Sequence, residues 1–120
     1  MGCQYFAPTE HGAESFTVAM PKLTFGRGCL AEAGIRALSH GMKRAALFTD
    51  SFLLHGPYVD TVRRSLKEAG IDVAVFADVR IEPSDATVVA AAEFLRDDHF
   101  DGVVSVGGGS VMDTAKAAMV

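Results

Sequence analysis

The residues with the clearest chemical potential lie near the end of the 120-residue sequence. Three consecutive glycines, Gly107, Gly108 and Gly109, follow the apolar run 103–106 and precede Ser110. Helix formers come next, so the pattern predicts a strand, a glycine turn and a helix. Glycine lets a backbone approach a phosphate closely, and the first amides of a helix can donate hydrogen bonds to it. The turn is therefore a candidate pyrophosphate site.

Simpler explanations of these residues stay open. A run of glycines can merely make a sharp turn, and this spacing matches neither the dinucleotide fingerprint G-x-G-x-x-G nor the phosphate loop G-x-x-x-x-G-K-[ST]. Asp113 lies three residues after Ser110, so the two could form a capping box that only protects backbone amides. Lys116 could pair with Asp113 on the surface of the same helix.

Asp50 is a second candidate because it follows the compact apolar run 45–49, which predicts a strand buried on both faces. A carboxylate at the carboxyl end of a parallel strand can accept a hydrogen bond from a ribose hydroxyl, and it repels a 2′-phosphate. This position predicts a preference for NAD over NADP. The alternative is that Asp50 opens a turn or caps the next helix.

The elements that would position these residues alternate along the chain. Gly41 and Gly70 are placed to end helices, and Ser84 is placed to begin one. Residues 15–19 and 21–28 suggest two short extended pieces, a possible edge hairpin. We expect strands at 45–49, 73–76 and 102–106, and helices at 30–38, 58–69, 86–95 and from about 110 onward.

This alternation predicts an α/β fold, a Rossmann-like parallel sheet with helices on both faces. We divide the chain into an N-terminal extension, residues 1–22, and a dinucleotide-binding domain, residues 23–120. The last helix carries no stop signal before Val120, so the domain is expected to be truncated.

Composition narrows the partners and the compartment. A formal net charge of -4 gives no basic field, so no nucleic-acid partner is expected. No apolar run approaches the roughly 20 residues that span a membrane, and the N-terminus lacks a targeting pattern. Two cysteines suit a reducing compartment, so we expect the cytoplasm, with the mitochondrial matrix as the alternative. The four histidines, at positions 11, 40, 55 and 99, have no metal-ligand spacing.

The segment GGGSVMDTAKA, residues 107–117, resembles the GGGSxxDxxK signature of the iron-containing alcohol dehydrogenases. FGRG, with Gly26 and Gly28, the TD of LFTDSFL and the proline turn before the helix at 86–95 follow in the family's order, so the resemblance spans residues 23–120. It implies that the glycines bind the NAD pyrophosphate and that Asp113 lies near the nicotinamide half. The expected cofactor-binding residues are Asp50, Gly107, Gly108, Gly109, Ser110 and Asp113.

The same resemblance implies the N-terminal domain of a two-domain, dehydroquinate-synthase-like fold. A divalent metal, iron or zinc, would be held by one aspartate and three histidines in a helical C-terminal domain outside this sequence. No catalytic residue and no metal ligand is therefore expected within these 120 residues, which alone would not be a competent catalyst.

Within the family, the sequence is most similar to the hydroxyacid-oxoacid transhydrogenases. This resemblance implies hydride transfer from a hydroxyacid such as 4-hydroxybutyrate to an oxoacid such as 2-oxoglutarate. We expect the full-length protein to be a homo-oligomer. The alternatives are an ordinary iron-containing alcohol dehydrogenase acting on small alcohols, an enzyme like maleylacetate reductase, and a nucleotide-binding module without catalysis.

Overall fold

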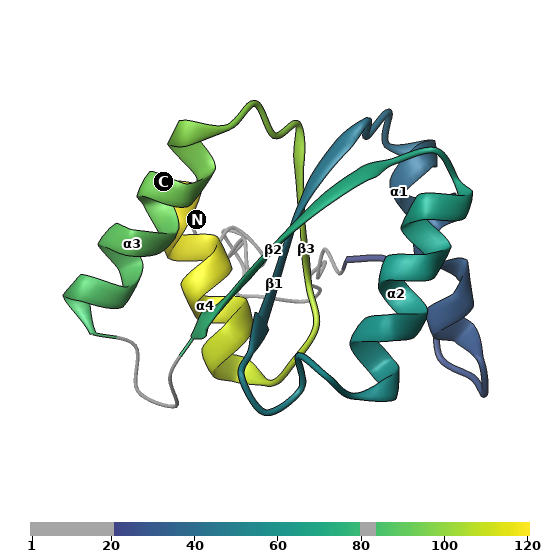
Figure 1. Ribbon diagram of the computed structural model, residues 1–120. Helices are drawn as coiled ribbons and strands as arrows, with labels where there is room; N and C mark the ends of the chain where they lie inside the picture. The colour runs from purple at the N-terminus through teal and green to yellow at the C-terminus, as the bar shows by residue number, and fades with distance from the viewer. Residues whose placement is uncertain (1–20, 80–83) are drawn as a thin grey trace, which may run out of the picture.

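The computed structural model describes residues 21–79 and 84–120. Three parallel strands form one sheet in the order β2-β1-β3, with helices on both of its faces (Figure 1). The strands are β1 (Arg44–Asp50), β2 (Asp72–Val79) and β3 (Gly102–Ser105). The predicted α/β class, with a parallel sheet between two helical layers, is confirmed.

The helices form one layer on each face of the sheet. Helices α1 and α2 lie together on one face, and α3 and α4 on the other (Figure 1). Their bounds are η1 (Cys29–Glu32, a 3-10 helix), α1 (Ala33–Ser39), α2 (Pro57–Glu68), α3 (Asp85–Asp97) and α4 (Gly109–Ala118). In the described ranges, no helix is long and apolar enough to cross a membrane.

Strand β1 lies at the centre of the sheet and serves both layers. Its five residues from Ala45 to Thr49 are fully buried. Side chains alternate across a strand, and here Ala45 and Leu47 pack with the α1/α2 side while Ala46 and Phe48 pack with the α3/α4 side. The expected strand buried on both faces is confirmed.

Local signals in the sequence set several of the helix ends. Gly41 and Gly70 have φ angles of 76° and 80°, a left-handed conformation that glycine adopts without strain, and each lies just after a helix. The hydroxyl of Ser84 accepts a hydrogen bond from the amide of Thr87 at 3.3 Å, which confirms it as the N-cap of α3.

The region before α1 differs from the expectation. Residues 15–19 lie outside the described residues, and the extended piece predicted at 21–28 is wrong, because residues 21–25 have no regular structure and the chain then turns. Gly28 has a φ of 75°, and its carbonyl accepts from the amide of Ala31 at 3.1 Å. The helix expected at 30–38 therefore begins as the separate 3-10 turn η1. At the other end, α4 ends at Ala118 rather than continuing to Val120.

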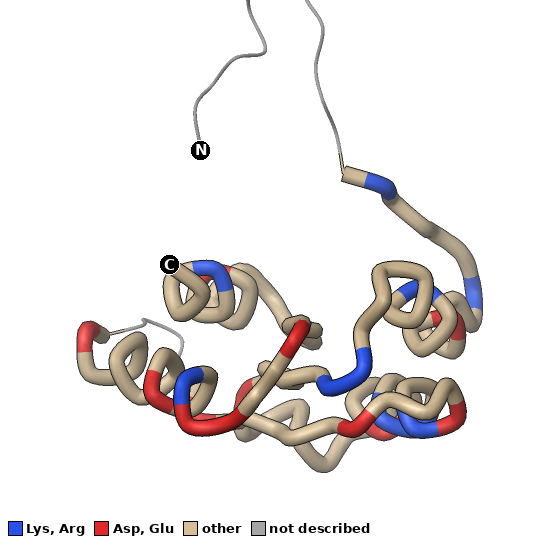
Figure 2. The backbone as a smooth tube through the Cα atoms, turned by 90° about the horizontal axis from the view of Figure 1, so that it is seen from above, with Lys and Arg blue, Asp and Glu red and all other residues tan. Residues whose placement is uncertain are grey.

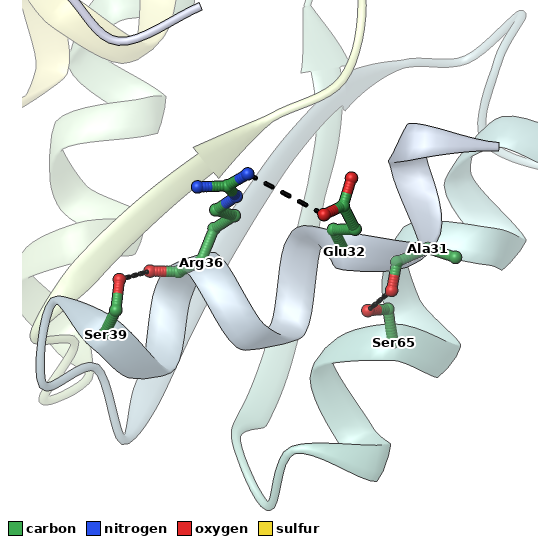
Figure 3. Close-up of polar contacts among 5 residues, drawn as sticks. All are labelled: Ala31, Glu32, Arg36, Ser39 and Ser65. Carbon is green, nitrogen blue, oxygen red and sulfur yellow. Dashed lines mark hydrogen bonds and ion pairs between the residues drawn. The ribbon is translucent and has the colours of Figure 1, made fainter. Parts of the chain in front are cut away.

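Ser65 joins α2 to the two helices packed on it (Figure 3). Its buried hydroxyl donates to the carbonyl of Ala31 at 2.7 Å and accepts from the amide of Gly34 at 2.8 Å. A Cβ on Gly34 would lie 2.1 Å from the Ser65 carbonyl oxygen, so only glycine permits this close approach. On the exposed side of α1, Arg36 and Glu32 form an ion pair at 3.7 Å.

At the amino ends of β1 and β3, a carboxylate holds the strands in register. Asp101 accepts from the amides of Arg44 at 3.0 Å and Lys43 at 2.8 Å, and these bonds lower the pKa of its carboxyl. The Arg44 guanidinium donates to Asp98 and lowers the pKa of that carboxyl as well.

Charged residues of both signs are interleaved over the helices (Figure 2).

Replacing Ser65 by alanine should lower the free energy of unfolding by about 1–3 kcal/mol, because the Gly34 amide would stay buried without an acceptor. The measurement is urea denaturation of the full-length protein. Ser39→Ala is the matched control, since the Ser39 hydroxyl donates to the Arg36 carbonyl on the exposed surface. Equal effects of the two substitutions would contradict a buried tie between α1 and α2.

Candidate nucleotide-binding site

The direction in which the chain adds strands to the sheet reverses between β1 and β3. From β1 the chain passes through α2 to β2, and then returns through α3 across β1 to β3. The helices that follow β1 and β3 therefore leave adjacent strand ends toward opposite faces of the sheet, as seen at the lower edge of Figure 1. Open parallel sheets bind ligands beyond the carboxyl ends of strands at such a switch point.

Both sequence-predicted groups lie at this switch point. Phe48 is paired with Ser105 in the sheet, and the amide of Val106 donates to the Phe48 carbonyl at 2.8 Å. Asp50 lies two residues beyond Phe48, and Gly107 lies two residues beyond Ser105. The structure therefore brings Asp50 and the glycine turn to the same edge, at the ends of neighbouring strands.

Gly107 is required by the packing of the chain itself. Its φ is 156°, and a Cβ there would lie 2.5 Å from Cγ2 of Val111, a buried residue of α4. The close approach of the turn to α4 depends on this glycine. For Gly107, the alternative of a sharp turn is therefore a sufficient explanation.

Gly108 and Gly109 differ from Gly107 in what surrounds them. A Cβ added to either would meet no atom within 4 Å, and Gly108 has an ordinary φ of -85°. Neither the described packing nor the backbone conformation of Gly108 calls for the absence of a side chain. A ligand that approaches the backbone here would call for it.

The first turn of α4 presents amides and no negative charge. Gly108 is the N-cap without a side-chain bond, and the first turn holds no acidic residue. The first helical bond runs from the Met112 amide to the Gly108 carbonyl at 3.2 Å, so the amides of Gly109 and Val111 have no acceptor one turn earlier in α4. Together with the positive end of the helix dipole, they suit an anion.

The structure shows neither the capping box of Ser110 with Asp113 nor the ion pair of Asp113 with Lys116. Ser110 lies inside α4 rather than at its N-cap, so the capping box with Asp113 is wrong. Among the described residues, the ion pairs are Glu32–Arg36 and Arg44–Asp98, and Asp113 and Lys116 form none with each other. Asp113 is exposed on α4, and its place beside the nicotinamide half stays a prediction.

Asp50 opens the loop after β1 and still has one oxygen to offer. Its Oδ1 accepts from the Leu53 amide at 2.7 Å, which realises the turn-opening alternative. Within 21–79 and 84–120, no group donates to Oδ2. The turn therefore orients the half-buried carboxylate, and the second oxygen can accept from a ribose hydroxyl.

Two residues beside Asp50 were missed by the sequence reasoning. Thr49 is fully buried, and its hydroxyl has no partner among the described residues; a threonine inside an otherwise apolar strand was the available signal. Phe52 exposes 90% of its surface only two residues after Asp50. An aromatic residue in the loop directly after the strand-end Asp50 was the signal for Phe52.

Metal-binding side chains do not gather in the part of the chain that the structure describes. There, no group of three His, Cys, Asp or Glu residues lies close enough to hold a metal ion. Cys29 is a half-exposed free thiol in η1. The described residues therefore do not form a site that fits a divalent metal.

Comparison with known proteins places the chain in a family. Residues 21–120 match the sequence model of the family described as iron-containing alcohol dehydrogenase. The chain is 41% identical over 104 residues to the mitochondrial hydroxyacid-oxoacid transhydrogenase of Mus musculus, covering 87% of this chain and 22% of that protein. It is 38% identical to the NAD-dependent methanol dehydrogenase of Bacillus methanolicus, covering 81% of this chain and 26% of that protein.

A solved structure agrees with both the fold and the family. NADH-dependent butanol dehydrogenase A from Thermotoga maritima superposes with a TM-score of 0.79 and 32% identity, over 88% of this chain and 27% of that one. This chain thus spans about a quarter or less of the length of the two relatives. The family match covers all but the first 20 residues, and we conclude that the chain belongs to the iron-containing alcohol dehydrogenase family.

Proposed function

We propose that this chain is the nucleotide-binding part of an NAD-dependent, metal-assisted oxidoreductase. One observation carries the proposal: Asp50 and the open backbone of Gly108 and Gly109 lie at neighbouring strand ends, at the switch point of the sheet. The names of two relatives, an NAD-dependent methanol dehydrogenase and an NADH-dependent butanol dehydrogenase, support the same cofactor.

In this proposal, the first turn of α4 holds the pyrophosphate. The amides of Gly109 and Val111 donate to phosphate oxygens, Gly108 and Ser110 line the same turn, and Gly107 keeps the turn close to Val111. On the neighbouring strand, the Asp50 Oδ2 accepts from a ribose hydroxyl. The same negative charge would repel a 2′-phosphate, so NAD is preferred over NADP.

The proposed reaction moves a hydride between NAD and the carbon of an alcohol or hydroxyacid, while the hydroxyl proton is lost and a carbonyl forms. A divalent metal, iron or zinc, would polarise the substrate oxygen, and we place its ligands outside these 120 residues. The residues described here bind and orient the cofactor. Asp113 is proposed to lie beside its nicotinamide half.

For the substrate, we propose a hydroxyacid-oxoacid pair, with a small alcohol as the second candidate. Similarity to the mouse transhydrogenase supports the first, and similarity to the methanol dehydrogenase supports the second. Three further expectations stay predictions. The N-terminal extension ends at residue 22 and the dinucleotide-binding domain begins at residue 23; the full-length protein forms a homo-oligomer; and it resides in the cytoplasm or the mitochondrial matrix. The word mitochondrial in the mouse relative's name supports the matrix.

Gly108→Val in the full-length protein should raise the Kd for NAD at least about tenfold, because the new side chain fills the space of the pyrophosphate. Its free energy of unfolding should change little, since a Cβ there meets no atom. Calorimetric titration and urea denaturation measure the two quantities. Gly26→Val is the matched control, because Gly26 has equally open surroundings away from the switch point. Unchanged NAD affinity in folded Gly108→Val would contradict the phosphate site.

Gly107→Ala should instead destabilise the fold, by about 1–3 kcal/mol, because its Cβ would collide with Val111. This contrast separates a glycine that serves packing from one that serves a ligand. It uses the same two measurements on the same protein.

The reaction is tested by assaying the metal-loaded full-length protein with 4-hydroxybutyrate and 2-oxoglutarate, with and without added NAD. Turnover of the pair without added NAD is the expected result, because an NAD that stays bound would take the hydride from the hydroxyacid and pass it to the oxoacid. Turnover of small alcohols only, with added NAD, would replace the transhydrogenase by the dehydrogenase. No hydride transfer with any alcohol, aldehyde, hydroxyacid or oxoacid would contradict the oxidoreductase itself.

A further inference from the structure

Phe52 is a large apolar side chain that the described fold does not use. It exposes 90% of its surface, and it is not among the rings that contact one another in the core, which are Phe48, Phe76, Phe94 and Phe100. Single exposed apolar residues are common on proteins, so exposure alone assigns nothing. The position of Phe52 is the informative feature.

The loop that carries Phe52 is held close to Asp50. The Leu53 amide donates to the Asp50 side chain at 2.7 Å, and the Leu54 amide donates to the Asp50 carbonyl at 3.1 Å. The Gly56 amide donates to the Leu53 carbonyl at 2.9 Å. Phe52 lies inside this hydrogen-bonded turn, so its backbone cannot move far from the Asp50 carboxylate.

The chemistry of a dinucleotide places its adenine near this turn. With the pyrophosphate at the end of β3 and the adenosine ribose on Asp50 at the end of β1, the molecule runs from β3 toward β1. The base is attached to the ribose at C1′, away from the phosphates, and so continues past β1. This path takes the base to the carboxyl end of β1, where the turn at 50–53 lies.

A purine offers two flat π faces, and a phenyl ring offers a matching one. We propose that Phe52 stacks on the adenine ring of the bound dinucleotide and makes the turn an adenine-binding surface. This inference rests on the proposed function, because it takes the ribose to lie on Asp50. Stacking would also bury apolar surface that the described fold leaves open.

Another exposed phenyl ring supplies the control. Phe25 exposes 97% of its surface, but it precedes η1, which packs on α2 rather than at the carboxyl edge of the sheet. Phe25→Ala removes the same chemical group from a different part of the chain. Phe52→Tyr keeps an aromatic face at the proposed position.

The test measures ligand affinities of the full-length protein by calorimetric titration. Phe52→Ala should raise the Kd for NAD and for ADP-ribose about 5- to 150-fold, the range found for loss of one base-aromatic stack. The Kd for reduced nicotinamide mononucleotide, which has no adenine, should not change. Phe52→Tyr and Phe25→Ala should bind all three ligands as the unaltered protein does.

Unchanged affinity of Phe52→Ala for NAD and ADP-ribose would overturn the stacking while leaving the nucleotide site intact. An equal loss for all three ligands would also overturn it, because the effect would not follow the adenine. If the unaltered protein binds no NAD, the proposed function fails, and the stacking fails with it.

Discussion

The burial of β1 on both faces is the constraint on which the rest of the structure depends. Phe48 contacts the rings of Phe76 and Phe94, with centroids 5.1 and 6.2 Å away, while Leu47 packs on the α1/α2 side. Each such side chain contributes about 1.5–3 kcal/mol when it leaves water. In the sheet, β2 and β3 pair with opposite sides of this strand. The direction of the chain then changes between β1 and β3, which brings Asp50 beside the glycine turn.

Each group at that edge combines a structural role with the chemical role that we propose for it. Asp50 uses its Oδ1 to hold the turn after β1, and no described group donates to its Oδ2. Within the glycine turn the roles are divided among residues, because Gly107 is set by Val111 whereas Gly108 and Gly109 are set by no neighbour. The turn opened by Asp50 and the sharp turn at Gly107 therefore explain these residues in part. They account for some atoms and leave others available to a nucleotide.

Most of the fold could be predicted because its signals are local or periodic. The apolar run of β1, the left-handed Gly41 and the N-cap Ser84 each appear in the sequence and in the structure. The segment before α1 was predicted wrongly because the short extended piece expected at 21–28 does not reveal that Gly28 turns the chain. The tie between Ser65 and Gly34 joins residues 31 apart in sequence, and no pattern in one sequence reports such a contact. Phe52 was missed because its importance depends on which residue lies beside it in space.

The central claim is that Asp50 and the glycine turn hold the two ends of one adenosine diphosphate unit. The most direct measurement is the ratio of the Kd for NADP to the Kd for NAD, in the full-length protein and in Asp50→Gly. We expect a ratio well above one in the unaltered protein. In Asp50→Gly the ratio should fall toward one, because the carboxylate that repels the 2′-phosphate is gone. A ratio that stays the same in folded Asp50→Gly would contradict the account.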